Sequence, residues 1–254
     1  VNYLPFLVLA LIGVDRFIEK RRGILLCVGL TLVYFHSFYY APSCLCVAGI
    51  YYLYRVRQAG TESADACENA PKGAGQRGAL AEESPKRATT EAASRHGDLK
   101  THGSFLLWIL LSVGLAAILL LPTGLDILST SKDAGSFAGS RMLFINPKLD
   151  GLLYSPYGMG LTLIGLYAVL YALEKRGLRL PAAAVLTASL FPVIPFVLNG
   201  FLYARGKILI PFLLLVCLIF VRVCEEYFTG KDVPKVWVGI LCLIPCLLLS
   251  DKYG

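Results

Sequence analysis

Charged residues are scarce in this sequence. Asp, Glu, Lys and Arg make up 16% of the 254 residues, whereas hydrophobic residues make up 56%. An average soluble domain is about one quarter charged. The deficit excludes a chain that is disordered throughout, and it argues against a soluble enzyme of this size or a secreted disulfide scaffold.

The familiar motifs of metal and cofactor sites are also missing. The eight cysteines include no CxxC pair, and no Cys/His set has the spacing of a zinc site. The chain has no Gly-rich phosphate loop, dinucleotide-binding fingerprint, serine nucleophile elbow or HExxH motif. Because most of the cysteines lie in apolar runs, we interpret them as small buried hydrophobes. Neither a metal nor a cofactor is predicted.

The N-terminus lacks the marks of a signal peptide. An apolar run begins almost at Val1, with no basic stretch before it and no small-residue cleavage site after it. We therefore expect the sequence to start partway through a larger protein.

Long apolar runs recur along the whole chain. Since open sheets cannot satisfy their backbone groups in lipid, each run is expected to be a helix. Several are shorter than the ~20 residues of a typical span, and flanking Tyr, Lys and Arg can extend them. The prediction is an all-α, multi-pass membrane bundle of about eight transmembrane helices. The runs are 3–14, 24–40, 43–56, 104–122, 156–173, 181–198, 208–223 and 234–250.

The connections between these runs supply an independent test. With strict alternation and the 15–23 loop in the cytoplasm, the inner connections hold 18 Lys and Arg and the outer ones hold 6. This asymmetry agrees with the positive-inside rule. It also accounts for the net charge of +7 without a nucleic-acid partner.

Two long connections divide the chain. Residues 58–103 contain no aromatic residue, no Val and no Ile, so they cannot bury enough surface to offset chain entropy. We predict a disordered cytoplasmic linker, most simply a tether and alternatively a docking segment. It separates a first helix group at 1–57 from a second at 104–254, whose connection 123–155 is predicted to face outward and to pack.

Two clusters on the predicted outer face carry polar groups. One surrounds His36 in the run 34–42, where the tyrosines fit an interfacial aromatic belt and the imidazole can either be structural or bind a polar substrate. The other, 153–160, contains Tyr157 and a Ser-Pro pair typical of a helix start. A helix N-terminus there can bind an anion such as phosphate, although plain helix initiation explains the same residues.

A third cluster places cations where the positive-inside rule does not favour them. The stretch 199–207 contains Asn199, Tyr203, Arg205 and Lys207 in a very short outer connection. The two cations can be end-caps that extend to the membrane surface. Cations beside an amide and a phenol also suit the phosphate of a lipid-linked donor, and the two interpretations are about equally supported.

These clusters resemble the YfhO family of bacterial multi-pass membrane proteins. The resemblance is carried by the strings GVDRFIEKRRG, LLYSPYGMGLT and NGFLYARGKILIPFLLL, in this order. It covers most of the chain outside 58–103 and is most specific at 151–213. The family is similar to the GT-C glycosyltransferases, which use a polyprenyl-phosphate sugar on the outer face, and its members glycosylate teichoic acid or other envelope polymers.

The resemblance implies a function and a set of residues. The chain is then part of a cell-membrane glycosyltransferase whose partners are membrane lipid, the polyprenyl-phosphate-linked sugar and the envelope polymer. We expect donor-phosphate binding by Arg205 and Lys207, with Arg141 third, and positioning by His36, Tyr157, Asn199 and Tyr203. The alternative is a non-catalytic lipid transporter or assembly partner.

The sequence departs from the family in length. Members are longer, and the acidic catalytic residue of GT-C enzymes lies in an early outer loop that would precede Val1. The catalytic residue is therefore unknown, and Asp126, Asp133 and Asp150 are assigned only as outer-face carboxylates.

Overall fold

The chain is helical throughout the part that the structure describes. The computed structural model describes residues 2–68, 99–130, 153–154, 158–200, 206–230 and 235–250, and these ranges contain no β-strand. The all-α prediction is confirmed for them. The elements are α1 (Leu4–Lys20), α2 (Ile24–His36), η1 (Phe38–Tyr40), α3 (Ala41–Glu68), α5 (Leu99–Thr130), α6 (Leu163–Ala172), α7 (Arg179–Leu190), α8 (Val193–Leu198), η2 (Gly206–Phe212), α9 (Leu213–Phe228) and α10 (Val236–Ser250).

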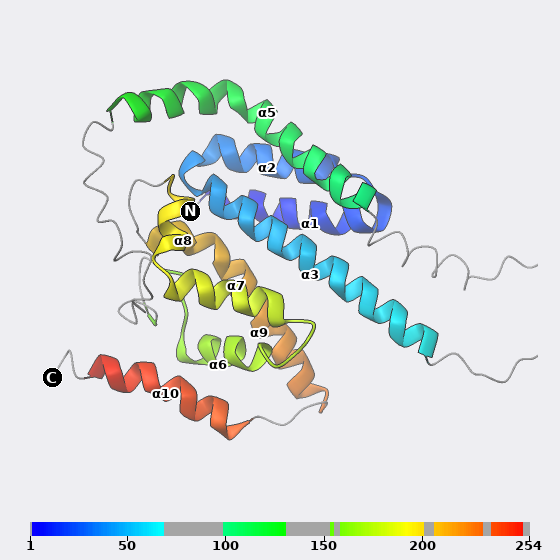
Figure 1. The fold of residues 1–254 in the computed structure, drawn as a ribbon, viewed down its shortest axis with the longest axis vertical. Helices are drawn as coiled ribbons and strands as arrows, with labels where there is room; N and C mark the ends of the chain where they lie inside the picture. Colours follow the sequence, from blue (N-terminus) through cyan, green and yellow to red (C-terminus); the bar gives the residue numbers. More distant parts are fainter. Residues whose placement is uncertain are drawn as a thin grey trace, which may run out of the picture.

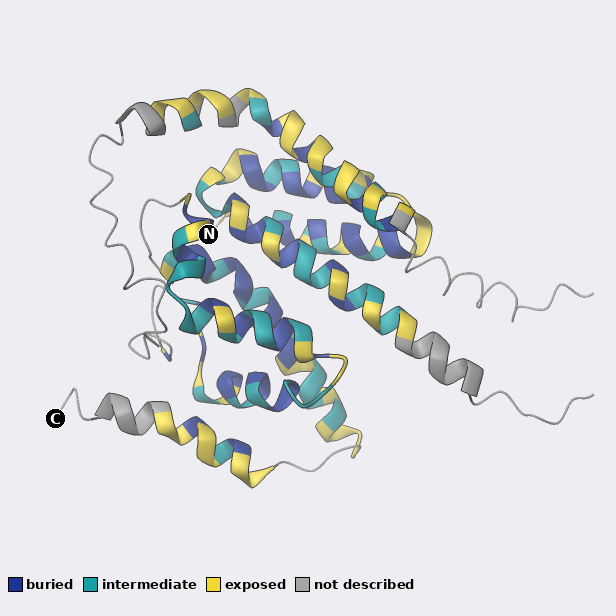
Figure 2. Cartoon of the chain, viewed as in Figure 1, coloured by how far each residue is buried: buried dark blue, intermediate teal, exposed yellow. Residues whose placement is uncertain are grey.

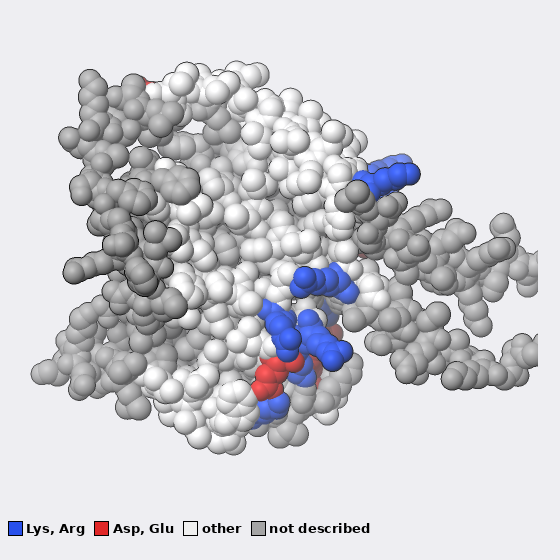
Figure 3. Space-filling model, in the orientation of Figure 1, with Lys and Arg blue, Asp and Glu red and all other residues white. Residues whose placement is uncertain are grey.

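Successive helices run back and forth between two ends of the molecule (Figure 1). One end holds the α1–α2 turn, the start of α5, the α6–α7 connection and the end of α9; we call it the basic end. The other end holds the N-terminus, the end of α2, η1 and α8; we call it the aromatic end. Lys and Arg side chains gather at the basic end of the described surface (Figure 3). Connections that were predicted to lie on the same side of the membrane therefore lie at the same end of the molecule.

The helices α1 and α2 form a hairpin in close backbone contact. A Cβ atom at Gly13 would lie 2.3 Å from the backbone nitrogen of Leu26, and one at Gly29 would lie 2.7 Å from that of Ala10. Glycine is required at both positions because any side chain would meet the backbone of the partner helix. The absence of side chains lets the two helices approach more closely than ordinary packing allows.

An aromatic cluster joins this hairpin to α3 and α5. The rings of Tyr52 and Phe105 stack with their centroids 3.8 Å apart, and Phe17 lies 5.8 Å from Phe105. Phe17 is fully buried, while Tyr52 and Phe105 are almost so. Three helices that are distant in the sequence therefore share one apolar contact near the basic end.

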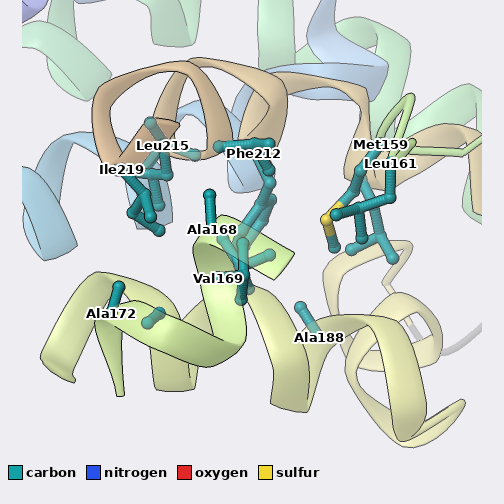
Figure 4. Packing of buried hydrophobic residues seen from close by; sticks show 14 of the residues in the cluster. Met159, Leu161, Ala168, Val169, Ala172, Ala188, Phe212, Leu215 and Ile219 are labelled. Atoms are coloured by element: carbon teal, nitrogen blue, oxygen red, sulfur yellow. The ribbon is translucent and has the colours of Figure 1, made fainter. Parts of the chain in front are cut away.

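The helices α6, α7 and α9 form a second packed group (Figure 4). The α6 residues Ala168, Val169 and Ala172 face Phe212, Leu215 and Ile219 from η2 and α9. Small side chains on α6 let α9 approach closely. The α3 residues Cys44 and Val47 belong to the same buried cluster, so α3 connects the two groups.

Several helix boundaries differ from the predicted ones. The helix α1 continues to Lys20, so the loop predicted at 15–23 is wrong over 15–20. The segment 181–198 is split at Phe191–Pro192 into α7 and α8, because proline cannot supply the backbone N–H that would continue α7.

The two long connections are also shorter than predicted. Residues 58–68 extend α3 and residues 99–103 begin α5, so the linker prediction is wrong at both edges. Residues 123–130 continue α5 past Pro122, so that part of the predicted outer loop is helical. The intervals 69–98 and 131–152 lie outside the described residues.

Among the described residues, two helical stretches are long and apolar enough to cross a membrane, Lys100–Ile118 and Gly206–Phe228. The shorter apolar helices α2, α6 and α7 have 13, 10 and 12 residues. At ~1.5 Å per residue they measure roughly 15–20 Å, less than the ~30 Å of a hydrocarbon core. Two candidate spans support membrane association, and the prediction of about eight spans is taken up below as a proposal.

Many residues of α5 and α10 are exposed (Figure 2), and a large share of them are large and apolar. In α5, Leu110 is 68% exposed and Ile118 is 79% exposed, and in α10 Ile240 is 60% exposed. Exposed large apolar side chains in such numbers on one helix are typical of a face that meets lipid or another protein.

The close contact in the hairpin gives a first prediction. Gly13→Ala should lower the free energy of unfolding by about 1–3 kcal/mol, because the backbones must separate to admit the methyl group. Thermal unfolding of the purified protein in detergent measures this change.

Gly49→Ala in α3 is the matched control, since a Cβ atom there has nothing within 4 Å. Alanine is favoured over glycine in a helix by up to about 1 kcal/mol, so this variant should be neutral or slightly stabilised. Equal melting temperatures for the two variants would contradict the close approach.

Candidate functional site

Aromatic rings from three elements cluster at the aromatic end. Tyr3 stacks on Tyr40 with centroids 4.6 Å apart, and Tyr39 meets Tyr40 edge-on at 4.9 Å. Phe6 of α1 contacts the ring of His36 at 4.5 Å. These contacts hold the start of α1 against the end of α2 and against η1.

His36 is the last residue of α2 and is exposed. Phe6 supports its ring in an edge-on arrangement, so the imidazole has a defined orientation while its surface stays accessible. An exposed imidazole can donate and accept hydrogen bonds, as a sugar hydroxyl or a phosphate oxygen requires.

Asn199 and Lys207 lie on elements that meet at the same end. Asn199 follows α8 and is 8% exposed, and Lys207 is the second residue of η2 and is half-buried. The element η2 packs against α8, η1 and α3. The structure therefore gathers the elements that carry His36, Asn199 and Lys207 at the aromatic end.

The other predicted site residues cannot be placed. Arg141, Tyr157, Tyr203 and Arg205 lie outside the described residues. Of the predicted outer-face carboxylates, Asp126 is an exposed residue of α5, while Asp133 and Asp150 lie outside the described ranges.

The predicted anion site at 153–160 needs a correction. The helix α6 begins at Leu163, after these residues, and Thr162 caps it by accepting a 3.1 Å hydrogen bond from the backbone N–H of Gly165. The hydroxyl of Tyr154 accepts a 3.4 Å hydrogen bond from the N–H of Leu163. Side chains of the protein therefore occupy N–H groups that a bound anion would need.

Two buried hydroxyl groups at the aromatic end were not predicted from the sequence. Tyr3 is 3% exposed and Ser43 is fully buried, and neither hydroxyl has a hydrogen-bond partner among the described residues. Buried polar groups normally have partners, often ordered water or ligand atoms. The aromatic pattern at 34–42 pointed to this end, but no local signal marked Ser43.

A network of charged and polar groups links α1 to α3 at the basic end. Arg55 Nε donates a 2.7 Å hydrogen bond to Asp15 Oδ1, and the Tyr51 hydroxyl donates to the same carboxylate at 3.0 Å. Arg55 also donates to Gln58 Oε1 at 3.1 Å. The apolar residues Ala10, Val14 and Phe17 keep helical spacing on both sides of Asp15. This pattern could have indicated that Asp15 lies in a helix.

A second set of ion pairs joins the C-terminal helices at the basic end. Lys175 pairs with Glu226 at 3.1 Å, and Lys235 pairs with Glu174. These contacts connect the α6–α7 connection to α9 and to the start of α10. Together with the Asp15–Arg55 pair, these two ion pairs join neighbouring elements at the basic end.

No described group of three or more His, Cys, Asp or Glu residues is arranged to hold a metal ion; the search covers only the ranges that the structure describes. Within those ranges, the chemistry available at the aromatic end is an imidazole, an amide, an ammonium group and several hydroxyls. This set suits hydrogen bonding and charge attraction to a phosphate or sugar.

Comparison with known proteins finds no matching family model, no matching curated protein and no matching solved structure.

The cap of α6 gives a second prediction. Thr162→Ala should lower the free energy of unfolding by about 1 kcal/mol, and Thr162→Ser should keep most of the stability, because serine can accept the same N–H. Unfolding of the purified variants measures this.

Thr187→Ala is the control, since the exposed Thr187 hydroxyl donates back to the carbonyl of Ala183 within α7. This variant should change stability by less than about 0.5 kcal/mol. Equal losses at Thr162 and Thr187 would contradict the assigned cap.

Proposed function

We propose that this chain is part of a multi-pass membrane glycosyltransferase of the YfhO type. Its aromatic end faces outward and binds the phosphate of a polyprenyl-phosphate-linked sugar. The sugar passes to an envelope polymer such as teichoic acid. Two observations support this function: the resemblance of the sequence to the YfhO family, and the arrangement of the described helices.

The membrane part of the proposal is supported by how apolar and charged residues divide. Exposed apolar side chains cover the sides of α5 and α10, while Lys and Arg gather at one end (Figures 2 and 3). Lipid-facing sides with cations at the inner surface produce this division. Two stretches meet the length of a span, and we propose that the shorter helices are completed by flanking residues to about eight spans.

The observation that carries the site is the position of Lys207. It belongs to η2, which packs against α8 and η1 at the end opposite the basic one. No rule of membrane orientation favours a cation there. A phosphate ligand gives such a cation a role, and Asn199 and His36 lie on neighbouring elements of the same end.

The chemistry assigns separate tasks to these groups. A hydroxyl oxygen of the acceptor attacks the anomeric carbon of the sugar, and the bond from that carbon to the phosphate oxygen breaks. The phosphate leaves with the bonding electrons, and Lys207 stabilises its charge. A base takes the hydroxyl proton; none of the described residues is assigned to that role. His36 and Asn199 orient the sugar or phosphate by hydrogen bonds.

The alternative is a non-catalytic lipid transporter or assembly partner. Transporters commonly carry charged residues near the middle of the bilayer. Here the ion pairs between described helices gather at the basic end, which favours the enzyme.

The proposed orientation can be tested by labelling in intact cells. Cys67 lies near the end of α3, beyond the basic end, and should be protected from an impermeant thiol reagent. A cysteine introduced as Phe38→Cys in η1, where Phe38 is exposed, should be labelled.

A Cys67→Ser variant identifies the signal of Cys67 after permeabilisation. Labelling of Cys67 in intact cells would reverse the orientation, and equal labelling of both positions before permeabilisation would exclude a membrane between them.

The role of Lys207 predicts an effect on donor binding. Lys207→Ala should weaken binding of a polyprenyl-phosphate analogue, because a charge-assisted contact is worth roughly 1.5–3 kcal/mol, about ten- to hundredfold in affinity. Lys207→Arg should retain most of the affinity. Binding is measured on the purified, correctly inserted protein.

Arg176→Ala is the control, an exposed arginine in the connection at the basic end, and should leave donor affinity unchanged. The Arg205→Ala/Lys207→Ala double variant should bind more weakly than either single variant. Unchanged affinity in the double variant would make both residues simple end-caps and remove the observation that carries the site.

A further inference from the structure

Four cations crowd the turn between α1 and α2. Arg16, Lys20, Arg21 and Arg22 are all exposed, and Glu19 is the one exposed acid among residues 15–24. The neighbouring acid Asp15 is bound to Arg55 on α3. The turn therefore carries a strong positive surplus.

The backbone of the turn is held in a fixed shape. Arg21 has a left-handed backbone with φ of 58°, and its N–H donates a 2.9 Å hydrogen bond to the carbonyl of Phe17. Trp108 of α5 covers Gly23, where an added Cβ atom would meet its indole ring at 2.3 Å. The cations thus project from a structured turn beside an indole.

The start of α5 lies beside this turn. His102 Nδ1 and the Tyr52 hydroxyl lie 3.0 Å apart, and Phe105 packs on Phe17 and Tyr52. Lys100, the second residue of α5, is exposed at the same end. We call Lys20, Arg22 and Lys100 the turn cations.

Several acids of the bundle are paired with other cations. At the basic end, Glu174, Glu225 and Glu226 pair with Lys235, Arg222 and Lys175 on the C-terminal helices. Figure 3 shows Lys and Arg side chains standing out at this end of the surface.

Apolar surface begins immediately beside the turn cations. Ile24, one residue after the turn, is 63% exposed, and Val28 is 45% exposed. On α5, Leu107 and Leu110 are 64% and 68% exposed. Exposed cations beside exposed aliphatic groups, with the Trp108 indole against Gly23 of the same turn, match the boundary between headgroups and acyl chains. A nucleic acid would not require the apolar part.

We propose that the turn cations form a binding surface for anionic phospholipid headgroups of the inner leaflet. The proposal rests on the membrane-spanning part of the proposed function and not on the donor site at the aromatic end. Each cation near an anionic surface strengthens attraction roughly fivefold. Bound headgroups would fix the α1–α2 hairpin and the start of α5 at the membrane surface.

Trp108 provides a reporter at this surface. The chain has two tryptophans, and Trp237→Phe leaves Trp108 as the only one. The full-length variant is reconstituted in bilayers that contain phosphatidylglycerol or phosphatidylcholine with brominated acyl chains, which quench indole fluorescence on contact. Brominated phosphatidylglycerol should quench Trp108 at a mole fraction at least about fivefold lower than brominated phosphatidylcholine.

The matched variants are Arg22→Gln at the turn and Arg176→Gln in the α6–α7 connection, two exposed arginines at the same end. Arg22→Gln should reduce the preference roughly fivefold, and Lys20→Gln/Arg22→Gln should abolish it. Arg21 is left unchanged because of its left-handed backbone. Arg176→Gln should keep the preference within about twofold.

The outcomes separate the two proposals. Quenching by both lipids to the same extent would overturn the headgroup surface and leave the membrane proposal intact. Absence of quenching by either lipid would overturn the membrane proposal itself. The preference for phosphatidylglycerol could also survive in Lys20→Gln/Arg22→Gln, or fall by the same factor in Arg176→Gln. Either result would mean that overall charge causes the preference, and would overturn the proposal that the turn cations cause it.

Discussion

The rest of the N-terminal helix group depends on the backbone contact between α1 and α2. With glycine at positions 13 and 29, the two helices meet without intervening side chains. This close approach makes α1 and α2 a narrow unit, which packs against α3 through α1 and against α5 through α2. Phe17 can then reach the stacked pair of Tyr52 and Phe105, so two glycines that each admit the partner backbone help to place helices that are far apart in the sequence.

The ion pairs between described helices lie at one end of the bundle, while apolar contacts fill its length. The Asp15–Arg55 pair joins α1 to α3, and the Lys175–Glu226 pair joins the α6–α7 connection to α9. Their side chains are about one third exposed, so each pair contributes no more than about 1 kcal/mol to stability. Their larger effect is on register, because each fixes which turns of two helices lie side by side.

The aromatic end has the opposite character. Its elements are short, and ring contacts rather than ion pairs hold them together. Short elements present many backbone and side-chain groups in a small volume, which is the usual setting for a binding site. The buried hydroxyls of Tyr3 and Ser43 fit this description, because they add unsatisfied polar atoms to an otherwise apolar cluster.

Apolar runs in the sequence predicted the helices well but predicted their ends poorly. Charge at Asp15 suggested a loop, yet a partner on α3 makes that carboxylate compatible with a helix. Ser155-Pro156 was interpreted as a helix start, whereas α6 begins at Leu163, directly after its capping residue Thr162. His36, Asn199 and Lys207 were predicted to lie on the same side, because successive connections were assigned to opposite sides of the membrane. Ser43 could not be predicted, because its burial depends on neighbouring helices that no local pattern specifies.

The brevity of the α1–α2 turn has a consequence for biosynthesis. Three residues, 21–23, separate the two helices, so α2 has no slack in which to remain in water after α1 has entered a bilayer. In the proposed multi-pass topology the pair enters together, and the cations of the turn resist translocation, at a cost of roughly 2.5–3.5 kcal/mol for each that reaches the bilayer centre. In the proposed topology, the side of the membrane on which this turn remains sets the direction of the α1–α2 hairpin.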